Sequence, residues 1–148
     1  MTIKYLNGDI FAHNADAIVD PCNCLGVQGA GLSKAFGMRF PRYSKQYKMA
    51  CTEGLVIGQL VLSDERENGF NFVIGVPTKY DFRKKSQIDF VDKGCEALVD
   101  LCNKLDIESV NVPALGCGCG KLSFNDVKRV YEKHFTQSET LFNCFTPR

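Results

Sequence analysis

The sequence predicts an α/β domain in which strands and helices alternate around a largely parallel sheet. The chain has 148 residues, which suits one domain with its own core. Hydrophobic residues make up 45% of the chain and charged ones 24%, the balance of a globular protein. Short β-rich runs alternate with amphipathic helical runs along the whole sequence, and this order is typical of a parallel sheet. No linker, repeat or low-complexity segment divides the chain, so we expect residues 1–148 to form a single domain.

The first third of the chain shows this alternation. A weakly alternating run predicts a strand over residues 3–7, and a buried apolar run predicts another over 17–20. A helix is expected over residues 31–40. It is ended by Pro41, which suits the first turn of a second helix. One side of that second helix is apolar or aromatic: Tyr43, Tyr47 and Cys51.

A hairpin and a long helix are expected in the middle of the chain. Residues 59–63 and 72–76 are β-rich, and Asn68-Gly69 between them is a strong hairpin signal. Ser86 and Asp89 have the spacing of a capping box and predict a helix start. The apolar stripe of that helix comprises Ile88, Val91, Cys95, Leu98 and Leu101.

The last part of the chain repeats the pattern. A buried strand is expected over residues 109–112 and a closing strand over 139–145. Between them, Ser123 with Asp126 is expected to cap an amphipathic helix over residues 124–135.

Glycine-rich loops follow two of the predicted strands. The first contains Gly26, Gly29 and Gly31 before a helix start, and the second spans residues 116–120. Glycine allows close approach of the backbone, and a helix start offers unpaired N–H groups to an anion, most often phosphate. A plain structural turn is the alternative, and the glycine spacing fits neither a dinucleotide-binding motif nor a P-loop. Ligands of such sheets lie beyond the carboxyl ends of strands, so both loops are expected to line one crevice and hold one diphosphate.

Charge and cysteine content limit the classes of function. The net charge of +1 argues neither for nor against a nucleic-acid partner. Two basic clusters, over residues 34–48 and 83–85, are either solvated faces or a positive rim around a polyanion site. The eight cysteines are expected to be reduced thiols of a cytoplasmic protein, since no signal segment precedes them. We expect no metal and no cofactor, because the Cys-x-Cys pairs lack zinc spacing, and no membrane span.

Three polar side chains are candidates for chemistry. Asp9 follows a glycine at a strand end and is either a turn residue or a ligand contact. Asn23 either satisfies local backbone groups or holds a sugar hydroxyl. Lys79 lies just beyond a buried strand and is either a solvated charge or a nucleophile or base.

Several blocks of sequence together resemble the macro domain, an ADP-ribose-binding module. They are residues 8–10, 16–19 and 23–32, the run P-T-K-Y-D-F-R at 77–83, and V-P-A-L-G-C-G-C-G-K-L at 112–122. The similarity is greatest to the branch that contains the DNA ADP-ribosyl glycohydrolase antitoxins, called the DarG type. It covers essentially the whole chain and implies a three-layer α/β/α sandwich with a mixed, mostly parallel six-stranded sheet.

The resemblance also implies roles for individual residues. Asp9 would accept the adenine amino group with the backbone of Ile10 beside it, and Asn23 would contact the distal ribose. Lys79 would be the catalytic residue, acting at the anomeric carbon of that ribose. Two runs of backbone would cradle the diphosphate: Gly29, Ala30, Gly31 and Leu32, and Gly116, Cys117, Gly118, Cys119 and Gly120.

The chain departs from the family pattern at two positions. Asp20 stands where the family usually has Asn, so we count Asp20 among the ligand-binding candidates but expect different contacts near the ribose. Gly120 stands where the hydrolases of this branch that act on acidic side chains carry an acidic residue. That difference favours an ADP-ribosylated base as substrate.

The resulting prediction is an ADP-ribosyl hydrolase that uses Lys79. It would act as a monomer on ADP-ribose attached to a nucleobase in DNA or to an acidic protein side chain. Two alternatives stay open. One is a phosphatase acting on ADP-ribose 1″-phosphate, and the other is a non-catalytic module that binds ADP-ribose or a related nucleotide signal.

Overall fold

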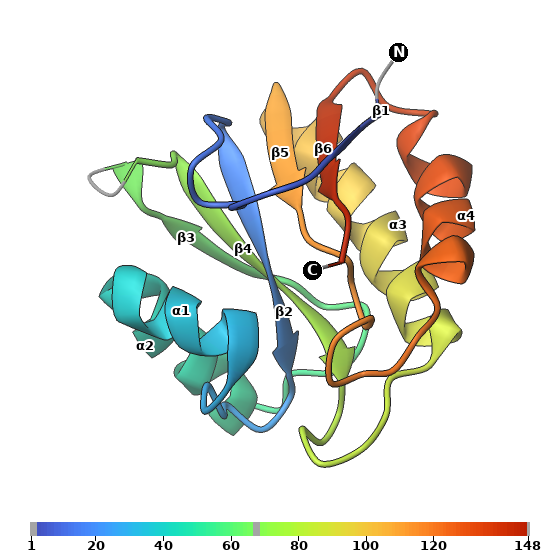
Figure 1. Cartoon of the computed structure of the whole chain (residues 1–148). Helices are drawn as coiled ribbons and strands as arrows, with labels where there is room; N and C mark the ends of the chain where they lie inside the picture. The colour runs from blue at the N-terminus through green and yellow to red at the C-terminus, as the bar shows by residue number, and fades with distance from the viewer. Residues whose placement is uncertain (1–2, 67–68, 148) are drawn as a thin grey trace.

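The computed structural model describes residues 3–66 and 69–147. In these ranges the chain forms six strands and four helices, arranged as a three-layer α/β/α sandwich (Figure 1). The strands are β1 (Ile3–Leu6), β2 (Ala17–Asn23), β3 (Val61–Asp64), β4 (Phe72–Lys79), β5 (Ser109–Val112) and β6 (Leu141–Phe145). The helices are α1 (Gly31–Arg39), α2 (Pro41–Thr52), α3 (Ile88–Leu105) and α4 (Phe124–Phe135). The predicted fold class is confirmed.

The sheet has the strand order β1-β6-β5-β2-β4-β3. All neighbouring pairs are parallel except β3 with β4, which are antiparallel. The antiparallel pair agrees with the predicted hairpin, although Asn68 of its turn lies outside the described residues. Five parallel strands therefore end at the same edge of the sheet, and this edge is where ligands of such sheets bind.

The two central strands are longer than the sequence predicted. β2 continues past Asp20 to Asn23, and β4 continues past Val76 to Lys79. Proline cannot donate a hydrogen bond in a sheet, so a sequence pattern indicates a strand end there. Here the chains pass through Pro21 and Pro77, and a register irregularity follows between Cys22 and Asn23. The extension places Asn23 and Lys79 at the ends of β2 and β4, where the two residues are register partners in neighbouring strands.

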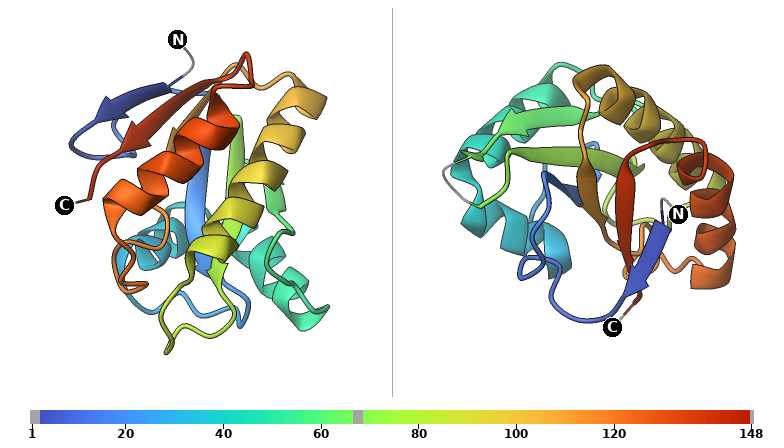
Figure 2. Two further views of the ribbon diagram at one scale, coloured as in Figure 1. Left: turned by 90° about the vertical axis from the view of Figure 1, so that its right-hand side faces the viewer. Right: turned by 90° about the horizontal axis from the view of Figure 1, so that it is seen from above.

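Two hydrophobic clusters hold the layers together. Figure 2 shows α3 and α4 on one face of the sheet, and α1 and α2 on the other. Alternate residues of β2 face the two clusters: Ala17 and Val19 pack with the α3–α4 cluster, and Ile18 and Cys22 with the α1–α2 cluster. Asp20 has the same parity as Ile18 and Cys22, so its carboxyl group points into the α1–α2 side.

The two predicted serine caps differ from expectation. Ser86 does not cap α3: the residue at the N-cap is Gln87, which makes no side-chain cap bond. The Ser86 hydroxyl donates instead to the carbonyl of Thr78, 2.6 Å away. Ser123 is the N-cap of α4 as predicted, but its side chain makes no cap hydrogen bond. The spacing thus located both helix starts to within a residue while misassigning the hydrogen bonds.

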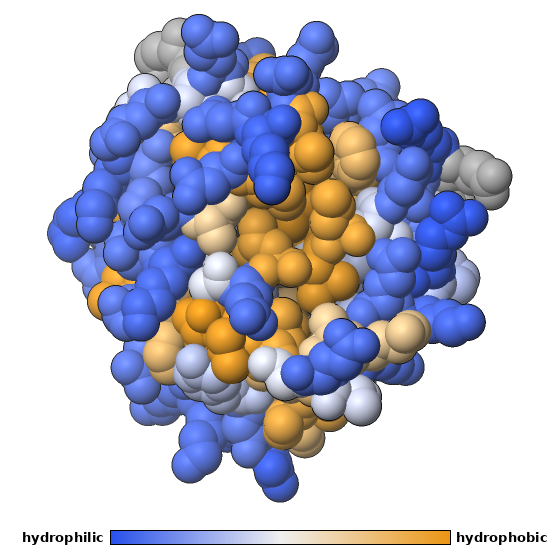
Figure 3. Space-filling view, turned by 180° about the vertical axis from the view of Figure 1, so that it is seen from behind, coloured by the Kyte–Doolittle hydropathy of each residue, from blue (hydrophilic) through white to orange (hydrophobic). Residues whose placement is uncertain are grey.

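The surface combines a mainly polar exterior with apolar areas. Figure 3 shows the side opposite to Figure 1, where apolar side chains gather in the middle and polar ones surround them. Within residues 3–66 and 69–147, we find no helix with the length and apolarity that crossing a lipid bilayer requires.

Candidate ligand site

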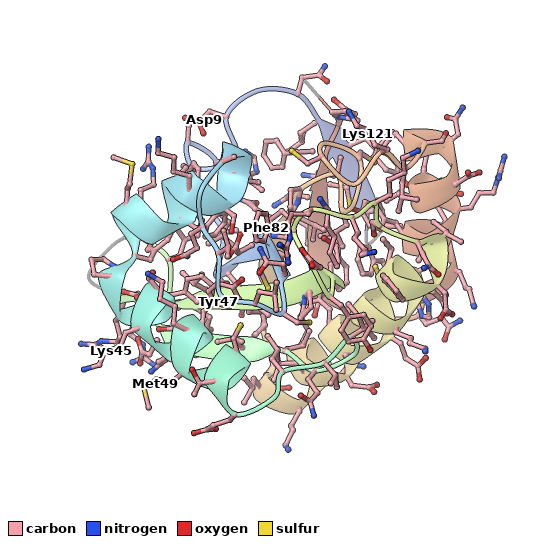
Figure 4. All side chains as sticks on the ribbon, turned by 90° about the horizontal axis from the view of Figure 1, so that it is seen from below. Asp9, Lys45, Tyr47, Met49, Phe82 and Lys121 are labelled. Carbon is pink, nitrogen blue, oxygen red and sulfur yellow. The ribbon has the colours of Figure 1, made fainter. Side chains whose placement is uncertain are left out.

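A cavity of about 930 Å³ lies at the carboxyl ends of the five parallel strands. Residues at or after the end of each of these strands line it, including 8–11, 29–33, 116–120 and 145–147 together with Lys79 and Phe82. Figure 4 looks onto this end of the molecule, with Asp9 and Lys121 on opposite sides and Phe82 between them. The size falls in the range of pockets that enclose a whole small-molecule ligand. Topology therefore brings together segments that are more than a hundred residues apart in the sequence.

The first glycine loop leads into the N-terminus of α1 at the wall of this cavity. Gly29, Ala30, Gly31 and Leu32 all line it. Gly31 begins the helix with φ +59°, a left-handed conformation that favours glycine. Ala30 at the N-cap makes no side-chain cap bond, and the first turn carries no acidic residue. The unpaired N–H groups and the dipole of α1 consequently favour an anion in the cavity.

Asn23 holds the first loop in place with its side-chain amide. The Nδ2 group donates to the carbonyl of Val27 at 2.9 Å, and Oδ1 accepts from the N–H groups of Leu25 and Val27. The hydroxyl of Tyr47 donates to the same oxygen at 2.9 Å. Asn23 lines the cavity but is 7% exposed. Asn23 therefore satisfies local backbone groups, which is one of the two roles considered in the sequence analysis. A ribose contact stays a prediction, and it would use the second Nδ2 proton.

Asp20 lies beneath the first loop and does not line the cavity. Its side chain is fully buried, and Oδ2 accepts a hydrogen bond of 2.6 Å from the hydroxyl of Tyr43. Burial raises the pKa of this carboxyl group to about 7, while hydrogen bonding to Tyr43 and Ser33 opposes the shift. Asp20 is therefore joined to α2 through Tyr43 and to α1 through Ser33, while Ser33 itself lines the cavity. The expected ligand contact of Asp20 stays a prediction.

The second glycine loop is closed by its own backbone. Leu122 N–H donates to the carbonyl of Gly116 at 2.9 Å, and Ser86 N–H donates to the carbonyl of Gly120 at 3.0 Å. A Cβ on Gly120 would lie 2.4 Å from the Gly116 carbonyl oxygen and 2.9 Å from Ser86 Cβ. The loop as folded therefore has no room for a side chain at position 120. All five predicted residues, 116 to 120, line the cavity opposite α1.

Lys79 is the last residue of β4 and lines the same cavity as the two loops. Its residue is 9% exposed and lines the cavity, and Nζ donates to the carbonyl of Phe82 at 3.2 Å. The solvated-charge alternative is therefore wrong for this lysine. A mostly buried cation at the wall of a cavity can interact strongly with an anionic or polarised ligand.

The adenine end of the predicted site lies near β1 and β6. Asp9 and Ile10 line the cavity, and Asp9 Oδ1 accepts from the N–H of Phe11 at 2.9 Å. Phe145 also lines it, with its ring edge against His13 at 6.0 Å between centroids. Both the turn role and the ligand role of Asp9 are compatible with this geometry, because only one carboxylate oxygen is used in the turn.

The cysteines of the site are free thiols, as are all eight in the chain. Burial raises the pKa of Cys117 to about 11 and that of Cys22 well above its usual value. A thiol with a raised pKa is a weak nucleophile near neutral pH. In the described residues, no group of three or more His, Cys, Asp or Glu side chains is placed to hold a metal ion.

Several cavity residues had no predicted ligand-binding role, among them Phe11, Arg39 and Phe82. Phe11 and Arg39 line the wall next to Asp9, with the Arg39 guanidinium 4.3 Å from the centre of the Phe11 ring. Phe82 lines the wall next to Lys79. A signal existed for Phe82, since it lies in the P-T-K-Y-D-F-R run. None existed for the pairing of Phe11 with Arg39, which are far apart along the chain.

The fold and the site define a class of protein: an α/β/α domain whose two glycine loops form an anion cradle at the ends of parallel strands. Comparison with known proteins agrees. The family described as Macro domain matches residues 19–131. The DNA ADP-ribosyl glycohydrolase of Mycobacterium tuberculosis is 35% identical over 137 residues, which cover 91% of this chain and 39% of that protein. The chain belongs to the macro domain family.

Solved structures and a second enzyme show the same likeness. The macrodomain of Mycobacterium tuberculosis DarG has a TM-score of 0.94 and 32% identity, covering 99% of this chain and 98% of that one. Thermosipho africanus DarTG in complex with ADP-ribose has a TM-score of 0.91 and 26% identity, covering 99% and 42%. The ADP-ribose 1″-phosphate phosphatase of Lodderomyces elongisporus is 24% identical over 149 residues, covering 90% of this chain and 92% of that protein. The chain spans about two fifths of the length of the glycohydrolases it matches.

Proposed function

We propose that this macro domain binds ADP-ribose in the cavity and hydrolyses the bond between the distal ribose and an ADP-ribosylated nucleobase. The observation that carries the proposal is the position of Lys79. Lys79 ends β4 and lines the same cavity as the N-terminus of α1 and the second glycine loop, and its Nζ donates to the carbonyl of Phe82. The relative from Thermosipho africanus was solved with ADP-ribose and shares this fold.

The two loops would supply most of the affinity. Backbone N–H groups at the start of α1 and in residues 116–120 are already fixed by the fold, so little reorganisation is needed to bind a diphosphate. Binding energy from this remote part of the substrate would hold the distal ribose in position for attack at C1″.

Lys79 would act at C1″ in one of two ways. As a nucleophile, its amine would form a bond to C1″ while the bond to the base breaks, and the base would leave with the electron pair and a proton. The glycosylamine formed in this way would open its ring, with the C1″–O4″ bond breaking and O4″ taking a proton, to give an imine. Water would then hydrolyse the imine and return the free amine and ADP-ribose, whose ring closes again. As an electrostatic group, the ammonium would stabilise negative charge on the leaving base while water attacks C1″ directly. Borohydride distinguishes the two, because it reduces an imine to a stable adduct on Lys79.

Two features favour a nucleobase in DNA over an acidic protein side chain. Position 120 has no room for the acidic residue expected in hydrolases of acidic side chains. The helices α1 and α2 contain no acidic residue and carry five exposed cations, of which Arg39 also lines the cavity: Lys34, Arg39, Arg42, Lys45 and Lys48. Lys45 points outward at the margin of the face shown in Figure 4. Phosphates of a nucleic-acid strand would be attracted to such a face, with an affinity that falls as salt rises.

The test is Lys79→Ala. Removing the cation should leave ADP-ribose affinity within a few fold of the wild type, because the loops supply the affinity. Release of ADP-ribose from a base-modified oligonucleotide should fall at least about 100-fold. Lys104→Ala, an exposed lysine on α3, is the matched control and should change neither value. Undiminished turnover by Lys79→Ala would refute the role of the lysine.

A phosphatase is the second candidate function, favoured by the similarity to the Lodderomyces elongisporus enzyme. It predicts phosphate release from ADP-ribose 1″-phosphate that is unaffected by Lys79→Ala. A panel of base-linked, acidic-residue-linked and 1″-phosphate substrates distinguishes the two enzymes. Tight binding of ADP-ribose without turnover of any of the three would indicate a binding module instead.

A further inference from the structure

The loop that follows β4 presents two aromatic side chains at the surface, and only one of them faces the cavity. Tyr80 is 48% exposed and Phe82 is 42% exposed. Phe82 lines the cavity, whereas Tyr80 is not among its lining residues and makes an edge-to-face contact with Phe90. Figure 4 shows Phe82 in the middle of the open end of the molecule. A large apolar side chain at a cavity mouth offers a surface that a ligand can cover.

This loop is fixed by short-range hydrogen bonds. Oδ1 of Asp81 accepts from the backbone N–H and from Nε of Arg83, each at 2.9 Å, and Oδ2 accepts from Nη2 at 2.8 Å. The N–H of Lys84 closes the turn on the carbonyl of Asp81 at 3.1 Å. The guanidinium carbon of Arg83 lies 5.3 Å from the centre of the Phe82 ring. The ring is thus held beside the cavity before a ligand arrives, which lowers the entropy cost of stacking.

Phe82 is also tied to the proposed reaction centre. Lys79 Nζ donates to the Phe82 carbonyl at 3.2 Å, and this hydrogen bond holds the lysine amine next to the backbone of Phe82. If Lys79 acts at C1″, the diphosphate on O5″ of the distal ribose extends toward the glycine loops and the leaving group on C1″ extends the other way. Among the aromatic residues that line the cavity, Phe82 is the nearest in sequence to Lys79 and the one that is exposed.

We propose that Phe82 is the stacking platform for the leaving group and that it selects a planar nucleobase over an acidic side chain. This inference rests on the proposed function. A base has a π-face that stacks on an aromatic ring, and a carboxylate side chain has none. The one guanidinium in the loop is already paired with Asp81, so it offers little attraction to a carboxylate leaving group. Phe82 would therefore favour the base-linked substrate by stacking on the base, and no charged side chain is needed for this selection.

The first arm of the test measures turnover on two substrates. Phe82→Leu keeps an apolar side chain of similar size and removes the π-face. We expect kcat/KM for a thymine-linked ADP-ribose oligonucleotide to fall by about ten- to a hundredfold. Turnover of an acidic-residue-linked ADP-ribose peptide should stay within about twofold. Phe82→Trp should retain turnover of the base-linked substrate, and Tyr80→Leu, the matched control outside the cavity, should change neither.

The second arm measures binding and does not depend on turnover. In a Lys79→Ala background, a thymidine-linked ADP-ribose should bind about tenfold more tightly than ADP-ribose itself. Phe82→Leu should abolish that gain and leave the Kd of ADP-ribose unchanged. Equal affinity for the two ligands, or equal loss on both substrates in the first arm, would overturn the role of Phe82. A further outcome is that the wild type releases ADP-ribose from no substrate while thymidine-linked ADP-ribose still binds more tightly than ADP-ribose. In that case the hydrolase proposal is wrong and the stacking role of Phe82 is retained.

Discussion

The two glycine loops form opposite walls of one cavity, yet the chain supports them in different ways. The first loop depends on buried polar side chains beneath it, chiefly Asn23 with Tyr47 and Asp20 with Tyr43. The second depends on backbone hydrogen bonds and on close contact at Gly116 and Gly120. A buried carboxyl group makes the first loop sensitive to pH. Close contact makes the second loop sensitive to an added atom at position 116 or 120.

Asp20→Asn tests the first loop and should have the largest effect on stability. The pKa of the Asp20 carboxyl group is raised by burial from 3.8 to about 7, so the folded state holds a proton that the unfolded state has lost between these values. The free energy of unfolding that this group contributes therefore falls as pH rises from 4 to 7. Asparagine cannot ionise and can still accept from Tyr43. The variant should be equal to the wild type near pH 4 and up to about 4 kcal/mol more stable at pH 8.

Urea denaturation at several pH values measures this difference. A gap between the two proteins that stays constant from pH 4 to pH 8 would show that Asp20 does not titrate in this range. The claim that the first loop is more sensitive to pH than the second would then be wrong.

Gly120→Ala tests the second loop. The added Cβ would lie 2.4 Å from the carbonyl oxygen of Gly116, so the backbone must move. We expect a loss of about 3 kcal/mol in the free energy of unfolding, together with weaker ADP-ribose binding. Gly118→Ala is the matched control, because nothing lies within 4 Å of its added Cβ, and it should cost less than about 0.5 kcal/mol. Similar losses in the two variants would mean that the loop is not closely packed.

Ser86→Ala should have the smallest effect of the three. The hydroxyl of Ser86 donates to Thr78 at the end of β4, while its N–H donates to Gly120, so the residue joins the second loop to the strand that carries Lys79. Loss of one buried hydrogen bond should cost about 1 kcal/mol. Ser123→Ala removes a serine at a true N-cap that makes no cap bond, and it should cost less. Thermal denaturation compares the two variants. A larger loss of unfolding free energy in Ser123→Ala would show that the Ser123 hydroxyl does cap α4.

Sequence patterns predicted the architecture and the meeting of the two loops because both follow from periodicity. Buried strands alternating with helices require a parallel sheet, and a parallel sheet places the segments after its strands at one edge. The same reasoning brought Asp9, Asn23 and Lys79 to that edge before the cavity was visible. The strand ends were missed at Pro21 and Pro77, where local preference indicates a stop and neighbouring strands override it.

Side-chain partners could not be predicted, because they depend on contacts between distant segments. Ser86 has the spacing of a cap, but the carbonyl of Thr78 competes for its hydroxyl. Asp20 occupies a position where a family comparison suggests a ligand contact, but its side chain is buried against Tyr43 on α2. Phe82 was part of a recognised block of sequence, and only the fold shows that it lines the cavity.

The central claim is that one cavity holds the diphosphate between the two loops and places the distal ribose at Lys79. A crystal structure of the protein grown with ADP-ribose tests it most directly. We predict density for the diphosphate between residues 29–32 and 116–120, with C1″ of the distal ribose next to Lys79 Nζ. Density at another place, or no bound ligand at millimolar ADP-ribose, would contradict the account.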